Sequence, residues 1–103
     1  MKNFIRAAII ILMTSSSQAW AKDTVIEIKN HQFTPAAITV TAGTTVIWIN
    51  KDDDPHTVLA KGGVFHSAAL DTNDKYSYTF TKPGTYKYLC TMHPVMTGSI
   101  IVK

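Results

Sequence analysis

Residues 84–96 read Gly-Thr-Tyr-Lys-Tyr-Leu-Cys-Thr-Met-His-Pro-Val-Met, and this stretch decides both the fold and the candidate site. Successive side chains of a strand point to opposite faces, so Tyr86, Tyr88 and Cys90 share one face. Lys87 lies on the other face and has to be in contact with water. We therefore predict that Cys90 points inward, at the place where the strand ends and a loop begins.

Short runs with strand composition precede and follow this one, separated by turn residues such as Ala42-Gly43 and Lys82-Pro83-Gly84. Residues 45–50 are largely apolar on both faces, as in a central strand. No run has a sustained helical period. The sequence predicts an all-β sandwich of two sheets with about seven strands. The predicted strands are residues 24–29, 37–41, 45–50, 56–60, 75–80, 84–89 and 98–103.

The loop after the quoted strand contains three side chains that bind soft metals. Cys90, His93 and Met96 offer a thiolate, an imidazole and a thioether. With a second histidine, this is the donor set of a blue-copper electron-transfer site, in which methionine is the weak axial ligand. Zinc prefers thiolate, imidazole and carboxylate donors and calcium prefers oxygen, so neither ion would be expected to recruit a thioether. Met92 is an alternative to Met96, but it lies between two ligands, and we assign it to the rim of the site.

The second histidine has to come from another part of the sandwich, and three histidines compete for the position. We favour His56, because Pro55 fixes the backbone before it and the residues after it read as the start of a strand. A ligand at the mouth of one strand can meet a loop at the mouth of another. We expect His31, in the first turn region, and His66, after a Gly-Gly loop, to be surface residues.

With these residues in view, the chain resembles a cupredoxin. Its Cys-x-x-His-x-x-Met loop, with a proline directly after the histidine, is most similar to the amicyanin branch, and plastocyanins and pseudoazurins come next. The resemblance covers nearly the whole chain after the first residues. Besides the loop, it rests on residues 55–58, 76–80, 83–86 and 96–100.

The resemblance implies a Greek-key β-sandwich, one copper ion shuttling between Cu(I) and Cu(II), and no bond-making chemistry, so the protein is expected not to be an enzyme. It also implies that His93 is the ligand that reaches the surface and passes the electron. Leu89 departs from the plastocyanin pattern, which has an aromatic residue directly before the cysteine. A second electron exit of the plastocyanin kind is therefore in doubt.

The first residues have the form of a secretory signal: a positive start, an apolar run from Ala7 to Met13, and the small-x-small site Ala19-Trp20-Ala21. We predict a cleaved signal at residues 1–21, a single domain at residues 22–103, and a periplasmic location. The net charge of +3 comes largely from the signal. In an oxidising compartment a lone cysteine is buried, joined to another chain or bound as a ligand.

The near-neutral domain predicts no nucleic-acid partner and no stable membrane insertion, and we expect a monomer. Transient redox partners are expected to dock near His93, Pro94 and Val95. The acidic run of Asp52, Asp53 and Asp54 is read as a solvated turn. A periplasmic copper carrier or storage protein with the same ligands is the alternative function. A thiol enzyme using Cys90 lacks an orienting third residue and gives no role to the methionine.

Overall fold

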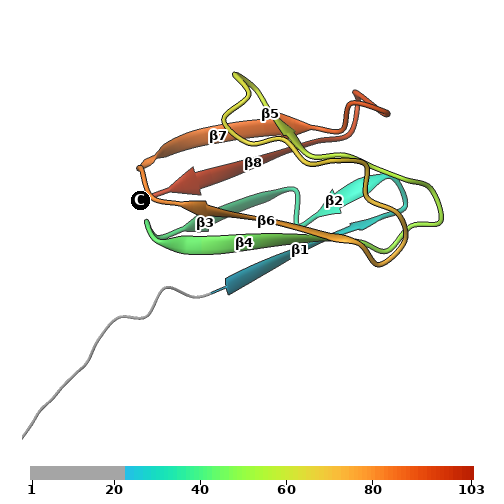
Figure 1. The fold of residues 1–103 in the computed structure, drawn as a ribbon. Helices are drawn as coiled ribbons and strands as arrows, with labels where there is room; N and C mark the ends of the chain where they lie inside the picture. Colours follow the sequence, from blue (N-terminus) through green and yellow to red (C-terminus); the bar gives the residue numbers. More distant parts are fainter. Residues whose placement is uncertain (1–22) are drawn as a thin grey trace, which may run out of the picture.

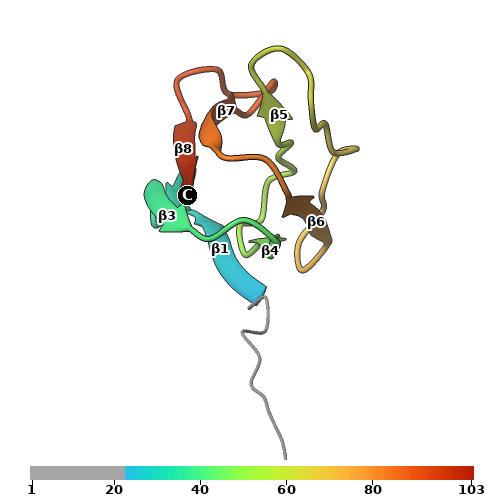
Figure 2. The same cartoon turned by 90° about the vertical axis from the view of Figure 1, so that its left-hand side faces the viewer.

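The computed structural model describes residues 23–103, so the predicted signal at residues 1–21 lies outside the described residues. Two four-stranded sheets face one another, with the orders β2-β1-β4-β6 and β3-β8-β7-β5. Figure 1 shows the sandwich from the side, and Figure 2 shows the two sheets as separate layers. The strands are β1 (Asp23–Lys29), β2 (Gln32–Thr34), β3 (Ala37–Val40), β4 (Thr44–Asn50), β5 (Leu59–Ala60), β6 (Lys75–Phe80), β7 (Gly84–Leu89) and β8 (Thr97–Val102). The predicted all-β sandwich is confirmed.

Strand β4 lies inside its sheet, parallel to β1 and antiparallel to β6. Its side chains alternate between fully and partly buried, as expected for a central strand of β-branched residues and tryptophan. Gly43, in the turn before β4, has a φ of 98°, a conformation that glycine adopts without steric cost. The direction of β4 carries the chain toward the right-hand end of Figure 1.

In the second sheet, β7 and β8 form an antiparallel hairpin whose connection is the Cys90–Met96 loop. Strand β3 pairs in parallel with β8, and the short β5 pairs with the other edge of β7. Because β4 and β7 both run toward the same end, the segment after β4 and the loop after β7 meet there (Figure 1). This end of the sandwich contains all of the predicted metal ligands.

The core lies between the sheets and is rich in aromatic side chains. Trp48 is fully buried, and its ring centroid lies 5.4 Å from that of Tyr88 and 5.5 Å from that of Phe65. The ring of Tyr88 also meets Phe33 edge-on at 4.7 Å. Edge-to-face and offset contacts of this kind add to the free energy of burying large apolar rings. These aromatic contacts fix the inner face of β7 next to the Cys90–Met96 loop.

The strand predictions fail in two places. Strand β2 was not predicted, because three residues are too few for a periodicity. The segment becomes a strand because it pairs with β1 and buries Phe33. The strand predicted from His56 to Ala60 is regular only at Leu59–Ala60. Upstream of it, His56 forms an isolated bridge with Leu70. In residues 23–103 no helix has the length and hydropathy to cross a membrane.

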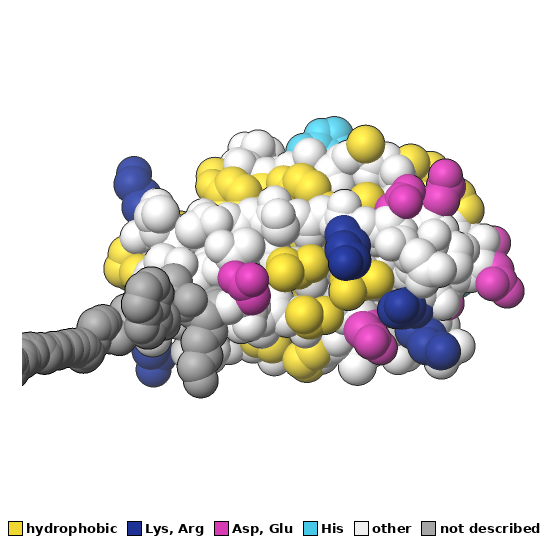
Figure 3. Space-filling model, turned by 60° about the horizontal axis from the view of Figure 1, so that its bottom comes forward, with side chains coloured by type: hydrophobic (Ala, Val, Ile, Leu, Met, Phe, Trp, Pro, Cys, Tyr) yellow, Lys and Arg dark blue, Asp and Glu magenta, His cyan; other side chains and the backbone are white. Residues whose placement is uncertain are grey.

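On the face drawn in Figure 3, lysine and carboxylate side chains lie among apolar and uncharged ones, with several carboxylates toward the right-hand end. Three of the ten basic residues, Lys2, Arg6 and Lys22, precede the described part. The described part therefore carries as many lysines as carboxylates.

Candidate metal centre

Cys90 follows β7 directly and is fully buried, as the strand alternation predicted. A small ring of backbone hydrogen bonds closes the loop that it begins. The Cys90 N–H donates to the Met96 carbonyl at 3.1 Å, the His93 N–H to the Cys90 carbonyl at 3.3 Å, and the Met96 N–H to the His93 carbonyl at 2.8 Å. These bonds hold the cysteine, histidine and methionine of the loop in one compact turn.

His56 is fully buried in the segment that leads into β5. Its backbone is fixed by two hydrogen bonds with Leu70, at 3.1 Å from the His56 N–H and 2.7 Å to the His56 carbonyl. Its Nε2 lies 2.8 Å from the Oδ2 of Asp52. The other ring nitrogen, Nδ1, is left to face the cysteine.

Three donor atoms from these two segments converge on one another. The Sγ of Cys90 lies 3.7 Å from the Nδ1 of His56 and 3.8 Å from the Nδ1 of His93. All three side chains offer a ligand atom within 4.8 Å of the others. Atoms this far apart can share a single ion, because metal–nitrogen and metal–sulfur bonds are about 2.0–2.3 Å long. The donor set and its spacing thus fit a thiolate-imidazole metal centre.

Met96 is 3% exposed, and its backbone is hydrogen-bonded to that of Cys90. Its N–H and carbonyl make the loop bonds described above, so its backbone is fixed against those of His93 and Cys90. Met92, the alternative thioether, is 48% exposed on the outside of the loop. Burial favours Met96 over Met92 as the methionine of this centre.

Thr57 joins the His56 segment to the Cys90–Met96 loop. Its N–H donates to the Cys90 Sγ at 3.3 Å, and its Oγ1 accepts from the Thr91 N–H at 2.8 Å. The two threonine hydroxyls are 2.7 Å apart. A thiolate that accepts a backbone N–H is held in place and its charge is stabilised, which tunes any metal it binds.

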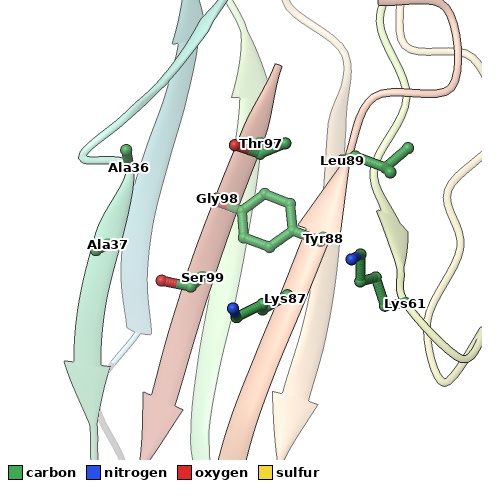
Figure 4. Close-up of a pocket in the computed structure, with 9 residues that line it drawn as sticks. All are labelled: Ala36, Ala37, Lys61, Lys87, Tyr88, Leu89, Thr97, Gly98 and Ser99. Atoms are coloured by element: carbon green, nitrogen blue, oxygen red, sulfur yellow. The ribbon is translucent and has the colours of Figure 1, made fainter. Parts of the chain in front are cut away.

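Tyr88 lies two residues before Cys90 on the same inner face of β7, and its ring needs a glycine at the position opposite. The ring of Tyr88 lies across Gly98 on the neighbouring strand (Figure 4), where a Cβ would overlap the ring atoms. Its burial, offset in part by the nearby Trp48 indole, raises the pKa of Tyr88 to about 12. On the outer face of the same strands a shallow hollow is lined by residues that include Lys61, Lys87 and Leu89 (Figure 4).

Two residues that contact the candidate histidine ligands from outside, Asp52 and His31, have no local signal in the sequence. Asp52 accepts hydrogen bonds from the Asn30 and His31 backbone N–H groups, at 2.7 and 2.9 Å, as well as from His56. Its partial burial alone would raise the pKa of Asp52. The bonds from His31, Asn30 and His56 outweigh this and hold the pKa below its ordinary value.

His31, predicted to be a simple surface residue, is half exposed and packs against both candidate ligand rings. Its ring centroid is 4.6 Å from that of His93 and 5.2 Å from that of His56, and its Nε2 lies 2.8 Å from the Oδ2 of Asp54. His66 is exposed, as predicted. No periodicity in the sequence marks His31, because its position depends on the conformation of the turn between β1 and β2.

Comparisons with known proteins agree with this geometry. The family described as "Cupredoxin-like domain" matches residues 3–102. Amicyanin from Paracoccus versutus is 30% identical over 121 residues, covering 94% of this chain and 92% of that protein. Amicyanin-alpha from Methylorubrum extorquens is 35% identical over 91 residues, covering 84% and 76%.

A solved structure gives the same result at the level of the fold. A purple cupredoxin from Nitrosopumilus maritimus superposes with a TM-score of 0.73 and 30% sequence identity, covering 78% of this chain and 99% of that one. The family match at residues 3–102 spans all strands of both sheets and the loop between β7 and β8. The chain therefore belongs to the cupredoxin-like family, as a member that resembles the amicyanins.

Proposed function

We propose that this protein carries single electrons between redox partners, with one copper ion held by His56, Cys90, His93 and Met96. The observation that carries the proposal is the convergence of the Cys90 Sγ with the Nδ1 atoms of His56 and His93, at 3.7 and 3.8 Å. A copper ion bound there would supply a one-electron Cu(I)/Cu(II) couple. Thiolate, imidazole and a weak thioether together are the donor set of such sites.

The protein holds these donor atoms in fixed positions and shields them from water. His56 and Cys90 are fully buried, and Met96 is nearly so. Hydrogen bonds fix the Cys90 sulfur, the His56 ring and the loop backbone from different segments. A set of ligands that moves little between the two oxidation states lowers the reorganisation that each electron transfer requires.

Electron exchange with a partner is proposed to occur at His93. This histidine is partly exposed, and its neighbours on the loop are apolar: Val95 is 94% exposed and Met92 is 48% exposed, with Pro94 between them. A small exposed apolar patch suits brief docking, because transient electron-transfer interfaces are small. We infer that a redox protein docks around His93, Pro94 and Val95.

We also propose that the protein is located in the periplasm. A signal at residues 1–21, removed on export, leaves a periplasmic domain of residues 22–103. The balance of lysines and carboxylates in the described part supports a partner other than nucleic acid. We propose that the domain acts as a monomer, and gel filtration at micromolar concentration tests this directly.

The experiment is the visible spectrum of purified residues 22–103 after addition of Cu(II), followed by titration with a reductant. An intense blue or purple band that bleaches on reduction and returns on oxidation supports the electron carrier. Cys90→Ser is expected to lose the band, since no thiolate remains. His56→Ala is expected to lose it too, whereas the matched control His66→Ala keeps it. A coloured Cys90→Ser protein would exclude the assignment.

The alternative function, copper carriage or storage, predicts another result with the same sample. A colourless protein that binds Cu(I) and exchanges it quickly with a chelator would favour it. The burial of Cys90 and His56 argues for retention of the ion instead.

A further inference from the structure

One carboxylate joins the candidate copper site to a distant turn. Asp52 receives the Asn30 N–H on its Oδ1, and both the His31 N–H and the His56 Nε2 on its Oδ2, at 2.7, 2.9 and 2.8 Å. Its side chain is only 12% exposed. Because a carboxylate accepts and cannot donate, the proton of the His56 ring must lie on Nε2. The lone pair of Nδ1 is then free on the side that faces the Cys90 sulfur.

The turn that Asp52 holds has an unusual backbone. Asn30 and His31 have φ values of 54° and 55°, in the left-handed region that residues other than glycine seldom adopt. Such a pair turns two successive N–H groups toward one point, which makes an anion-binding concavity. The carboxylate that fills it comes from the segment after β4, 21 to 22 residues away in the chain. Because Asn30 and His31 are the two turn residues of the β1–β2 hairpin, their positive φ values are set by the hairpin, and Asp52 fixes this turn to the segment after β4.

The same turn places a third imidazole against the site. The ring of His31 lies beside that of His93 at 4.6 Å, with the planes tilted by 33°, and meets that of His56 edge-on at 5.2 Å. Its Nε2 is fixed by Asp54 at 2.8 Å. The ring therefore covers part of both candidate ligands. The hairpin sets the conformation of the turn, and Asp52, together with Asp54 on the ring, holds the turn against the site.

We propose that Asp52 is a positioning residue for the copper site: its carboxylate sets the tautomer and the plane of His56 and, through the Asn30–His31 turn, holds His31 against His93. The inference rests on the proposed function, because it concerns how strongly the ligands bind copper. A carboxylate behind a ligating histidine raises the basicity of that ligand. Better donation favours Cu(II), so Asp52 lowers the reduction potential and strengthens Cu(II) binding.

The test compares Asp52→Asn with Asp53→Asn. Both variants remove one negative charge from adjacent positions, but Asp53 is exposed and lies outside the contacts described above. We expect Asp53→Asn to stay near the wild-type protein in Cu(II) affinity and potential. Asp52→Asn should weaken Cu(II) binding by roughly 10- to 100-fold, measured by chelator competition, and raise the potential, measured by spectroelectrochemistry. Equal behaviour of the two variants would overturn the inference.

Two further measurements separate positioning from general damage. Asp52→Glu keeps the charge and the acceptor, and it should return the potential most of the way to the wild-type value. Proton NMR of the metal-free wild-type protein should show a slowly exchanging His56 Nε2–H, because that proton is buried and bonded. Absence of this signal overturns the inference, even if Asp52→Asn does not fold. A wild-type protein that shows the signal but binds no copper rejects the proposed function and leaves the role of Asp52 in orienting His56 supported.

Discussion

The backbone N–H of Thr57 donates to the Sγ of Cys90 at 3.3 Å, across 33 residues of sequence. The side chain of Thr57 continues this connection, since its Oγ1 accepts from the Thr91 N–H at 2.8 Å. One threonine thus joins the segment of one candidate ligand to the loop that contains the other three. The Thr57 hydroxyl also lies 3.7 Å from the Cys90 Sγ, but only the hydroxyl reaches the loop backbone, so Thr57→Val removes the contact with the loop and keeps the backbone N–H contact with the sulfur.

Thr57→Val is expected to loosen the loop without abolishing the metal centre. Valine has the shape of threonine but leaves the Thr91 N–H without its acceptor, which should lower the free energy of unfolding by about 1–2 kcal/mol. The N–H to Cys90 remains, so the copper band should persist. Urea denaturation of the metal-free protein measures the first effect and the visible spectrum the second.

Thr45→Val is the matched control for this prediction. The Thr45 hydroxyl lies 2.7 Å from that of Thr79 in an exposed cross-strand pair, where water can replace the bond. Loss of this bond should lower the free energy of unfolding by less than Thr57→Val does. If Thr45→Val destabilises the protein as much as Thr57→Val, the connection through Thr57 has no special weight.

Gly98→Ala is expected to disturb the hairpin below the metal loop. A Cβ at this position would overlap the ring of Tyr88, which is itself 1% exposed and cannot move toward solvent. Overpacking of this kind costs about 1–3 kcal/mol. Ser99→Ala, on the opposite face of the same strand, is the control and should be nearly neutral. Equal thermal midpoints for the two variants would contradict the packing argument.

Tyr88 should contribute a loss of stability at alkaline pH. Its pKa rises from 10.0 to about 12 in the folded protein because burial disfavours the phenolate. A folded pKa above the unfolded one stabilises the fold at pH below the unfolded value, and this stabilisation is lost as pH rises from about 10 to 12. At about 1.4 kcal/mol per pKa unit, the loss is on the order of 2–3 kcal/mol.

Tyr88→Phe tests this directly, because it removes the titrating hydroxyl and little else. The hydroxyl has no hydrogen-bond partner among the described residues, so its removal should not destabilise the protein at pH 7. Between pH 10 and 12 the variant should lose less stability than the wild-type protein. Parallel curves for the two proteins would show that Tyr88 does not titrate in this way.

Met96→Leu is expected to keep copper bound but to raise its reduction potential, because an apolar side chain no longer donates to Cu(II) from the axial position. Met92→Leu is the control, since Met92 is exposed and should leave the potential unchanged. Spectroelectrochemical titration of both variants measures the difference. A shift with Met92→Leu and none with Met96→Leu would exchange their roles.

Features that depend on local rules could be predicted from the order of the amino acids. Alternation along residues 86–90 placed Cys90 on the inner face, and the turn residues marked most of the strands. The donor types in the loop are enough to predict a soft-metal site there. All of these inferences need only the period of a strand and the preferences of side chains.

The tertiary structure alone decided what depends on two segments meeting. Strand β2 exists because Phe33 is buried against Tyr88, and three residues carry no period of their own. In the sequence, Asp52 is one of three acidic residues of a turn that is expected to be solvated. In the structure, the N–H groups of the Asn30–His31 turn point at its carboxylate. His31 lies beside His93 for the same reason. Hydrogen bonds across 21 or 22 residues depend on where the sandwich brings two loops together, and no local pattern records that distance.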